Sequence, residues 1–549
     1  MRFGLLLSAS LASATFRRGN GIIAPDGDDD EDDLELATLT GGSLHRKPKT
    51  DNQTTTGWGT FEQLIDHANP GLGTFSQRYW YGTEHWRGPG SPIFMMNPGE
   101  QSAEGFNKSF VGDQRLPMLF AKETGGAVVI MEHRYWGGSS PYENLTAENL
   151  QYLTLQNSLL DNTYFAQNLV PPFDPSGRSS PDKAPWIFSG GSYPGALAGW
   201  LAALEPGTFW AYHGTSGVVE AVGDFWQYFT PVLEATPENC TADVTAVIDH
   251  IDHLLLHGSE TDKESLKKKF KLQELEDADF AAALENGPWS WQSGQYYTGT
   301  ERQNPYYQFC DYVENAWPNS TEVPGPEGVG LHKALDGYAR WVKELLLPGY
   351  CESYGYDDWK GEYNTGCFAN SNASSIAYHD LSVDNYVNRQ WNWLLCNEPF
   401  KFWQDGAPEN RPSLVSRLVD VDYWEAQCAL FFPEGGYGIA KGKTVEDVNS
   451  WTGGWSVENT TRLLYANGQF DPWRDATVSS KDRPGGPLES TPELPVFVLP
   501  GGTHCSDYYK KNWEVNVDAR RIAYEETAII KLWTDQFYLE NPHHGKGKW

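Results

Sequence analysis

Short apolar runs separated by polar stretches dominate the first part of the chain. Three such runs, bounded by glycine and proline, are typical of buried parallel strands: Pro92–Met96, Ala127–Met131 and Pro185–Ser189. Between the second and the third lies Asn149–Asn168, whose amphipathic pattern predicts a crossover helix. Strands that alternate with helices favour a doubly wound α/β sheet, and we expect the folded part to begin near Phe61.

The pattern becomes helical near residue 218 and stays helical to about residue 440. Asp243–His257 and Glu264–Leu284 show the helical period most plainly. Strand-like runs then resume at Arg462–Ala466 and Pro495–Leu499. The simplest architecture is one sheet domain interrupted by a large helical cap domain. This assigns to the sheet domain residues 51–217 and 441–542, and to the cap domain residues 218–440.

A final helix is predicted beyond the last strand, at Val515–Phe537. Its apolar positions fall near one face of the helix: Val515, Ile522, Ile529 and Trp533. The lysine-rich tail after Pro542 predicts a frayed end.

The N-terminus carries the pattern of an export signal. Arg2 supplies the positive start, Leu5–Leu11 the short apolar run and Ala12–Ala14 a small-residue cleavage site, which predicts a signal peptide over residues 1–14. Residues 15–50 include the acidic block Asp26–Glu35 and form either a disordered leader or a propeptide. No apolar stretch is long enough to span a membrane, so we expect a secreted protein or one in a vacuole- or lysosome-like compartment.

Cysteines and glycosylation sequons fit an exported chain. The chain has 7 cysteines and no C-x-x-C, which leaves zinc and thioredoxin-type sites with little support. Neighbouring cysteines suggest the disulfides Cys240–Cys310, Cys351–Cys367 and Cys396–Cys428, with Cys505 free, although sequence does not determine connectivity. Several of the N-x-S/T sequons are expected to be glycosylated: Asn52, Asn107, Asn144, Asn239, Asn319, Asn372 and Asn459.

Composition narrows the possible partners. The 549 residues carry a net charge of −32, so nothing offsets phosphate repulsion and nucleic acid is not expected as a partner. Aromatic residues make up 14% of the chain, which indicates a well-packed core and excludes wholesale disorder. A strongly acidic surface suits solubility in an acidic medium. The oligomeric state stays open.

Ser192 has the surroundings of a nucleophile. It follows a predicted strand and precedes a small-residue helix start, within Ser189-Gly-Gly-Ser-Tyr-Pro-Gly195. A sharp turn of this kind exposes the serine Oγ, and small neighbours let the helix approach the strand. Pro194 replaces the second glycine of the usual G-x-S-x-G pattern, a change that a first helical turn tolerates. On this segment alone, a turn without catalysis is as good an interpretation.

Two later loops complete a serine-hydrolase pattern. Asp471 follows the strand at Arg462–Ala466, and His504 follows the strand at Pro495–Leu499. Sites in open α/β sheets gather beyond the carboxyl ends of the strands, and Ser, Asp, His is the chain order of α/β-hydrolases. We therefore predict Ser192 as nucleophile, His504 as base and Asp471 as the acid that orients the imidazole.

Stabilising an oxyanion requires two preorganised donors. One is the N–H of Tyr193, the residue after the nucleophile. The second is expected from the loop Asn97–Glu100, in which Gly99 lets the backbone approach, so Gly99 and Glu100 are the candidates.

Other chemistries have weaker support. His250, His253 and His257 recur at helical spacing beside Asp249 and Asp252, but a solvated face of a cap helix is favoured over a metal site. His133 is interpreted as a hydrogen-bonded structural residue at a strand end. No paired carboxylates in a glycosidase-like setting are discernible. We predict no metal and no cofactor.

Six segments together resemble the Pro-X carboxypeptidase and dipeptidyl-peptidase family of serine peptidases, and most closely fungal acid prolyl endopeptidases. They recur in order from about residue 55 to 510: Gly73–Trp80, Glu132–Trp136, Gly190–Tyr193, Trp393–Glu398, Asn467–Trp473 and Gly501–Asp507. The resemblance implies an α/β-hydrolase domain with a helical cap, proline-containing peptide or protein substrates, and cleavage after proline in acid. Pro194 departs from the small residue expected there, which bears on turnover.

The resemblance leaves the mode of cleavage open. An endopeptidase cutting internal Pro-X bonds is favoured, a Pro-X carboxypeptidase or dipeptidyl-peptidase is the alternative, and a non-catalytic binding module is disfavoured by the intact Ser192, Asp471 and His504. Glu398 is a candidate for binding an N-terminal amine. A proline slot requires a flat aromatic wall, and we expect it from Trp473, Trp391 and Trp393. Activity is expected to peak below pH 6, and neutral pH to weaken the fold.

Overall fold

The computed structural model describes residues 55–104, 112–299, 304–314 and 324–544. Its centre is an eight-stranded sheet with the order β1-β2-β4-β3-β5-β6-β9-β10. β2 pairs antiparallel with β1 and β4, and the remaining pairs are parallel. The strands are β1 (Thr56–Leu64), β2 (Thr74–Gly82), β3 (Ile93–Met96), β4 (Ala127–Met131), β5 (Trp186–Gly191), β6 (Ala211–Thr215), β9 (Leu463–Gly468) and β10 (Val496–Leu499).

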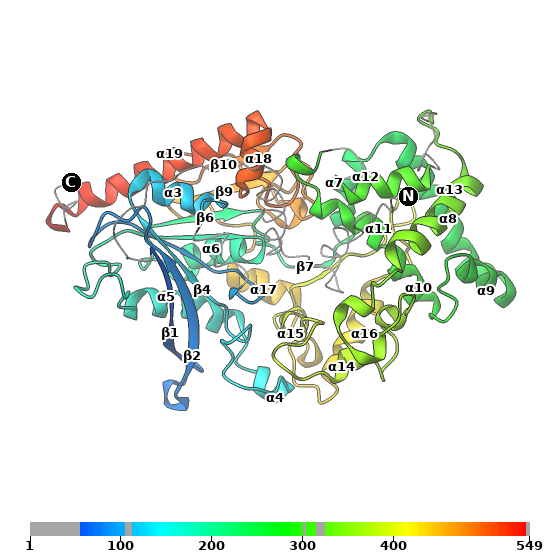
Figure 1. The fold of residues 1–549 in the computed structure, drawn as a ribbon, viewed down its shortest axis with the longest axis horizontal. Coiled ribbons are helices and arrows are strands. Elements are labelled where there is room, and N and C mark those ends of the chain that lie inside the picture. The colour runs from blue at the N-terminus through cyan, green and yellow to red at the C-terminus, as the bar shows by residue number, and fades with distance from the viewer. Residues whose placement is uncertain (1–54, 105–111, 300–303, 315–323, 545–549) are drawn as a thin grey trace, which may run out of the picture.

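Helices cover both faces of the sheet, which explains why its central strands are continuous apolar runs. Every residue of β3 and β4 is buried, and successive side chains point to opposite faces. Phe94 and Val128 pack with α3 (Leu116–Thr124) and α19 (Val517–Glu540). Met95 and Val129 belong to the core of the other face, with α5 (Leu155–Asn168) and α6 (Tyr193–Leu204). This is an α/β-hydrolase fold (Figure 1).

The chain between β6 and β9 forms a helical cap beside the sheet (Figure 1). Within the described residues its only strands form a two-stranded parallel ribbon, β7 (Val222–Asp224) with β8 (Lys401–Trp403). In the described part of this segment, the α-helices that precede α17 (Val445–Thr452) are α7 (Thr230–Ala235), α8 (Glu238–His257), α9 (Glu260–Lys269), α10 (Asp277–Leu284), α11 (Asn286–Trp289), α12 (Pro305–Val313), α13 (Leu331–Trp341), α14 (Ile376–His379), α15 (Arg389–Asn397) and α16 (Val421–Phe431).

All five predicted strands form, and the three predicted disulfides are confirmed. The bonds join Cys240 to Cys310, Cys351 to Cys367 and Cys396 to Cys428, all within the segment between β6 and β9. Cys505 is free and buried. In the described part of the chain, no helix combines the length and apolar composition needed to cross a membrane. The predicted signal peptide (residues 1–14) and acidic leader (residues 15–50) lie outside the described residues.

Four boundary predictions are wrong, and each error has a local cause. β1 begins at Thr56 and not near Phe61, because it pairs along its full length with β2. The helix predicted at Glu264–Leu284 is two helices, since Lys271 has a φ of 61° and ends the first. The helix predicted at Asn149–Asn168 is likewise α4 (Ala147–Leu150) followed by α5, whose N-cap is Thr154.

The last predicted helix also divides, into α18 (Lys510–Val515) and α19. Asn516 caps α19 with its side chain and lies in extended conformation, so the helical period restarts there. Val515 is consequently 62% exposed, and the buried face of α19 contains Ile522, Glu526, Ile530 and Trp533 instead of Ile529.

Candidate active site

Ser192 lies at a strained turn between β5 and α6. Its φ is 62° and its ψ is −126°, a conformation that non-glycine residues rarely adopt. A Cβ at Gly190 would lie 2.4 Å from the Pro194 carbonyl oxygen, and one at Gly195 would lie 2.7 Å from the Thr215 carbonyl oxygen. Glycine at both positions therefore lets α6 approach the sheet as a nucleophile elbow requires.

Pro194 fits this elbow without loss of a backbone hydrogen bond. It occupies the first turn of α6, where an N–H has no partner within the helix. Its ring lies against the loop after β3, because a Cβ at Gly99 would be 2.8 Å from Pro194 Cγ. The φ of Gly99 is 75°, so this close approach needs glycine for both space and conformation.

Asp471 and His504 form a buried pair beyond the ends of β9 and β10. The Nδ1 atom of His504 lies 3.0 Å from Oδ1 and 3.2 Å from Oδ2 of Asp471. Asp471 is fully buried, and its Oδ1 also accepts the N–H of Trp473 at 2.9 Å. The Nε2 atom of His504 is buried and has no hydrogen-bond partner among the described residues. A base needs this atom free to receive a proton.

The loop that carries His504 lies beside the elbow. A Cβ at Gly191 would be 3.1 Å from Cys505 Sγ, so the residues next to Ser192 and His504 in the chain are in contact. The structure thus gathers the Ser192 and His504 loops at the carboxyl end of the parallel strands, with Asp471 hydrogen-bonded to His504.

The backbone N–H groups predicted to bind the oxyanion differ in whether they are already hydrogen-bonded. Tyr193 is the first residue of α6, so its N–H has no partner within the helix and is available beside Ser192. The N–H of Gly99 donates to Asn97 Oδ1 at 2.9 Å and is not available, which corrects the choice of Gly99 as a donor. Glu100 is the remaining candidate; it is 2% exposed, and its carbonyl accepts Asn388 Nδ2 at 3.1 Å.

Tyr193 is held by groups from both the sheet and the cap. Its hydroxyl lies 3.1 Å from Nε2 of His133, whose Nδ1 bonds the Arg134 carbonyl. His133 is therefore a hydrogen-bonded residue just beyond β4, as predicted. The Tyr193 ring packs edge-on against Trp391 of α15, with centroids 5.5 Å apart. Trp391 thus contacts the residue that follows the candidate nucleophile Ser192.

Trp473 lies in a nest of aromatic rings next to His504. It is 1% exposed, and its indole is 6.3 Å from the His504 ring. Tyr228 and Phe402 pack edge-on against it at 5.2 and 5.4 Å. Its Nε1 and the Tyr228 hydroxyl both donate to Oε1 of Gln292, at 2.9 and 2.8 Å. Three residues of this cluster come from the cap and were not predicted from the sequence: Tyr228, Gln292 and Phe402.

Trp393 and Glu398 are placed differently from the expectation. Trp393 donates to the Leu153 carbonyl at 3.0 Å and packs against Phe432, so it is not brought to Tyr193 or Trp473. Two residues along α15 place it on a different side from Trp391. Glu398 is 6% exposed and accepts from Lys443 Nζ at 2.6 Å. Its negative charge is already compensated by an ammonium of the chain.

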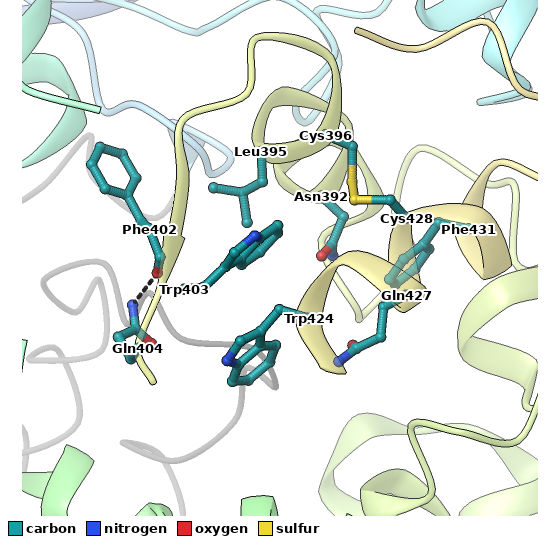
Figure 2. A pocket seen from close by; sticks show the side chains of 10 residues that line it. All are labelled: Asn392, Leu395, Cys396, Phe402, Trp403, Gln404, Trp424, Gln427, Cys428 and Phe431. Carbon is teal, nitrogen blue, oxygen red and sulfur yellow. Dashed lines mark hydrogen bonds between the residues drawn. A yellow bond between two sulfur atoms is a disulfide. The ribbon is translucent and has the colours of Figure 1, made fainter. Parts of the chain in front are cut away.

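The cap contains a cavity between α15, β8 and α16 (Figure 2). Trp403 and Trp424 stack in it with centroids 6.1 Å apart and planes 12° from parallel. Phe402 lines it and also contacts Trp473. None of Ser192, Asp471 and His504 lines the cavity, so it is separate from the candidate catalytic groups. Its lining residues are Asn392, Leu395, Cys396, Phe402, Trp403, Gln404, Trp424, Gln427, Cys428 and Phe431.

The family described as serine carboxypeptidase S28 matches residues 63–515, which is most of the chain. The chain belongs to the serine carboxypeptidase S28 family. The resemblance drawn from the six sequence segments is confirmed, and the protein is a serine-type peptidase.

Relatives of this S28 peptidase occur in fungi and animals. It is 42% identical to the serine protease vicPa of Bipolaris victoriae over 495 residues, covering 89% of this chain and 91% of that one. A probable extracellular serine carboxypeptidase of Arthroderma benhamiae is 29% identical, with 84% of this chain and 64% of that one covered. The thymus-specific serine protease of Mus musculus is 27% identical, with 82% of both covered. Among solved structures, a proline iminopeptidase of Mycobacterium smegmatis matches 88% of this chain and 100% of its own, at 13% identity and a TM-score of 0.32.

Among the described residues, the acidic groups outside the candidate active site show no arrangement that requires a metal. His213, Asp507 and Glu526 are the one group of possible metal ligands in the described part of the S28 peptidase. Both ring nitrogens of His213 are already engaged, Nδ1 with Ser189 Oγ at 2.8 Å and Nε2 with Glu526 Oε2 at 2.9 Å. On α8, Asp249 and Asp252 pair with Arg417.

The pKa of His504 depends on opposing effects. Burial lowers it, whereas the adjacent Cys505 and the Asp471 carboxylate raise it, and the resulting pKa lies well above the ordinary value. As the predicted base, His504 can accept a proton only as the neutral imidazole, so the rate per folded molecule is expected to rise with pH through this pKa. The expected activity maximum below pH 6 therefore gains no support from His504 and depends on how much enzyme stays folded.

Buried carboxyl groups favour the folded state in acid. Burial raises the pKa of Glu220 and Glu314 to about 7, that of Asp507 to about 8 and that of Asp405 to about 9. Burial also raises the pKa values of Glu285 and Glu526 well above their ordinary range. A raised folded-state pKa contributes stability that is complete below the unfolded value, near 4, and is lost as pH rises through the folded value.

Two buried imidazoles act in the opposite direction but over a lower range. Burial lowers the pKa values of His133 and His213 to about 4. Their contribution is complete above the ordinary histidine value, near 6.5, and is lost only as pH falls below it. Above pH 6.5 the buried carboxyl groups and His504, whose pKa is raised, determine the slope, and both make the stability fall as pH rises.

We expect the free energy of unfolding of the S28 peptidase to fall as pH rises from 6.5 to 8. Each buried carboxyl that is still protonated in the folded state removes up to about 1.4 kcal/mol per pH unit. The melting temperature should be lower at pH 8 than at pH 6 by about 10 °C. Thermal unfolding followed by circular dichroism at pH 6, 7 and 8 measures this.

Substituting one carboxyl tests the cause. Asp405→Asn removes a buried group, since Asp405 is 3% exposed, and should flatten the dependence on pH. Asp384→Asn removes an exposed carboxyl and should leave it unchanged. Equal melting temperatures at pH 6 and pH 8 in the parent would refute the prediction.

Proposed function

We propose that this S28 peptidase hydrolyses peptide bonds on the carboxyl side of proline within peptides, through an acyl-enzyme on Ser192. His504 takes the Ser192 proton and returns it to the leaving amine, and Asp471 fixes the imidazole tautomer. The Tyr193 N–H and an N–H of the loop at Glu100 stabilise the oxyanion. The function needs no cofactor and no metal.

The buried Asp471–His504 pair carries the proposal. A carboxylate that accepts Nδ1 at 3.0 Å leaves Nε2 directed away from it, and that atom is without a partner in the described part of the chain. A buried nitrogen without a hydrogen-bond partner costs free energy, and a catalytic role would explain it. The loop that carries His504 contacts the strained elbow of Ser192 through Cys505 and Gly191. A non-catalytic module would gain nothing from either feature.

The proline preference rests on aromatic residues around Ser192. Proline presents a compact, rigid and apolar ring, which suits a slot walled by flat aromatic faces. Trp473 follows Asp471 by two residues and lies by His504, while Trp391 packs on Tyr193. These two indoles support a slot at the nucleophile, and Trp393 is left out of it.

Two assays test the function in sequence. A fluorophosphonate probe should label the parent at Ser192, because the reaction needs only an activated serine. Proline-containing peptides blocked at both termini should then be cut after proline, as mass spectrometry of the products would show. A labelled enzyme that leaves blocked peptides intact and trims free termini would replace the endopeptidase by an exopeptidase.

A Pro-X carboxypeptidase is the second candidate. It is favoured by the family description and by the Arthroderma benhamiae relative, whose name describes an extracellular serine carboxypeptidase. A dipeptidyl-peptidase has less support, because the Lys443 ammonium already occupies the Glu398 carboxylate expected to bind an N-terminal amine. Peptides blocked only at the C-terminus separate these two activities.

We expect Trp473→Ala to lower kcat/KM for Pro-X peptides by about 10- to 200-fold, as loss of a stacked aromatic contact in a dry pocket does. Discrimination between Pro-X and Ala-X peptides should fall with it. Steady-state kinetics on paired Pro-X and Ala-X substrates measures both effects. Because Trp473 is 1% exposed, melting curves of the variant are needed to keep the assay within its folded range.

Trp393→Ala is the matched control. Trp393 is equally buried at 1%, but it contacts neither Tyr193 nor Trp473. The variant should therefore be less stable than the parent and still discriminate between Pro-X and Ala-X peptides. If Trp473→Ala slows Pro-X and Ala-X peptides equally, Trp473 supports the triad loop and does not select proline.

Export and glycosylation complete the proposal. The signal peptide predicted over residues 1–14, followed by the acidic leader predicted over residues 15–50, supports export to the outside of the cell or to a vacuole- or lysosome-like compartment. Of the sequon asparagines among the described residues, three are exposed and accessible to a glycosyltransferase: Asn144, Asn372 and Asn459. The division into sheet domain and cap at residues 218 and 440 belongs to the same proposal.

A further inference from the structure

We propose that Thr215 and Ser216 are positioning residues that hold the loops of Ser192, Asp471 and His504 in register. Thr215 ends β6 and Ser216 follows it. The inference rests on the proposed function, because it concerns how the triad is assembled. Neither residue was singled out by the sequence.

The main chain of these two residues binds the strands on either side. β6 lies between β5, which leads to Ser192, and β9, which leads to Asp471. The Thr215 carbonyl accepts the N–H of Ser192 at 2.9 Å. The N–H of Ser216 donates to the Ala466 carbonyl of β9 at 2.8 Å. These backbone hydrogen bonds do not depend on the identity of the side chains. They therefore fix β6 between β5 and β9 whether or not residues 215 and 216 carry a hydroxyl group.

The His504 loop, in contrast, is bound by both hydroxyl groups. Oγ of Ser216 accepts the N–H of Cys505 at 2.9 Å. Oγ1 of Thr215 donates to Oδ1 of Asp507. The two contacts bracket the residues directly after His504, so they determine where its imidazole lies relative to Ser192. Alanine or valine would keep the fold of β6 and lose these contacts.

Backbone strain indicates that the hydroxyl of Ser216 is needed. The φ angles of Ser192, Ser216 and Cys505 are 62°, 47° and 54°, all in the left-handed region. Each such residue costs about 1 kcal/mol or more, and glycine would avoid the cost. A serine at this position is therefore explained by the bond that its side chain makes to Cys505.

Water cannot replace the missing bonds. Thr215, Ser216 and Cys505 are 0% exposed and Asp507 is 1% exposed. Removing the Ser216 hydroxyl leaves the Cys505 N–H buried without an acceptor, and the loop must move to satisfy it. A displacement of about 1 Å in a catalytic group costs about 100-fold in rate. The hydroxyls act through His504 and do not touch substrate.

Two pairs of variants test the inference. Thr215→Val removes the hydroxyl at nearly constant shape, and Thr215→Ser keeps it. Ser216→Ala and Ser216→Gly both remove the hydroxyl, but glycine also relieves the strained φ. Thr534→Val is the control, because Thr534 is 2% exposed and its hydroxyl bonds only the Ile530 carbonyl of α19.

We expect kcat on a Pro-X peptide to fall about 10- to 100-fold in Thr215→Val, Ser216→Ala and Ser216→Gly, with KM changed less than about threefold. Thr215→Ser should recover most of the rate. Ser216→Gly should melt at or above the temperature of Ser216→Ala and still be slow, which a purely stabilising role does not explain. Inactivation by the fluorophosphonate should slow in the same order, and Thr534→Val should match the parent.

The outcomes separate this inference from the proposed function. A parent that does not react with the fluorophosphonate overturns the function, and the inference with it. A reactive parent whose Ser216→Gly and Thr215→Val variants keep the parental kcat overturns the inference alone. If Thr215→Val fails to fold, the two Ser216 variants decide the question.

Discussion

Ser192→Ala should lower peptidase activity by about 10⁴- to 10⁶-fold while the protein stays folded, since no other group of the site can form the acyl-enzyme. Stability should be nearly unchanged, because the side chain of Ser192 makes no capping hydrogen bond to α6 and alanine adopts the same backbone conformation at the same cost. Hydrolysis of a fluorogenic Pro-X peptide and a melting curve measure the two effects.

Ser290→Ala serves as the control for loss of a buried hydroxyl. Ser290 is 1% exposed and its hydroxyl bonds only the nearby Gly287 carbonyl of the cap. It should keep near-parental activity and full labelling by the fluorophosphonate. Activity of Ser192→Ala above about 1% of the parent would rule out Ser192 as the nucleophile.

The strands of the sheet that could be predicted from the sequence are mainly those that are apolar along their whole length. β3, β4 and β5 are covered on both faces, so their residues carry the signal of burial directly. β6 was not predicted, because its sequence, Ala-Tyr-His-Gly-Thr, includes the polar residue His213. In the structure His213 is buried and bonds Glu526 of α19, which is distant in the chain. A polar residue that is satisfied by a tertiary partner breaks the apolar pattern, and sequence alone does not reveal the partner.

The same limit applies to helix faces and to the site. Glu526 lies on the buried face of α19, where the apolar pattern would call for an apolar residue. The predicted apolar face was for this reason drawn through Ile529. Ser192, Asp471 and His504 stand out because chain order and strand ends are readable in the sequence. Thr215 and Gln292 do not, because their roles arise from contacts with residues such as Asp507 and Trp473, far away in the chain. The N–H of Gly99 was misjudged for the same reason, since only the structure shows that Asn97 accepts it.

Asp471→Asn should lower kcat by about 10⁴-fold with little change in the fold. The Trp473 N–H donates to Oδ1 of Asp471 and requires an acceptor there, so the asparagine oxygen must take that position. The amide NH₂ then occupies the place of Oδ2, which lies 3.2 Å from Nδ1 of His504. An amide donor facing Nδ1 makes that nitrogen the acceptor and moves the imidazole proton to Nε2. In this tautomer His504 cannot take the proton of Ser192.

Asp475→Asn distinguishes this tautomer effect from general loss of a buried carboxylate. Asp475 follows Asp471 closely in the chain, is 6% exposed and pairs with Arg474 and Ser480 instead of His504. It should keep activity within about tenfold of the parent, since no group of the triad depends on it. Asp471→Asn should also move the low-pH limb of kcat/KM toward lower pH, because the carboxylate that raises the pKa of His504 is gone. Equal losses in the two variants, or an unchanged pH limb in Asp471→Asn, would show that Asp471 only supports the loop and does not orient the base.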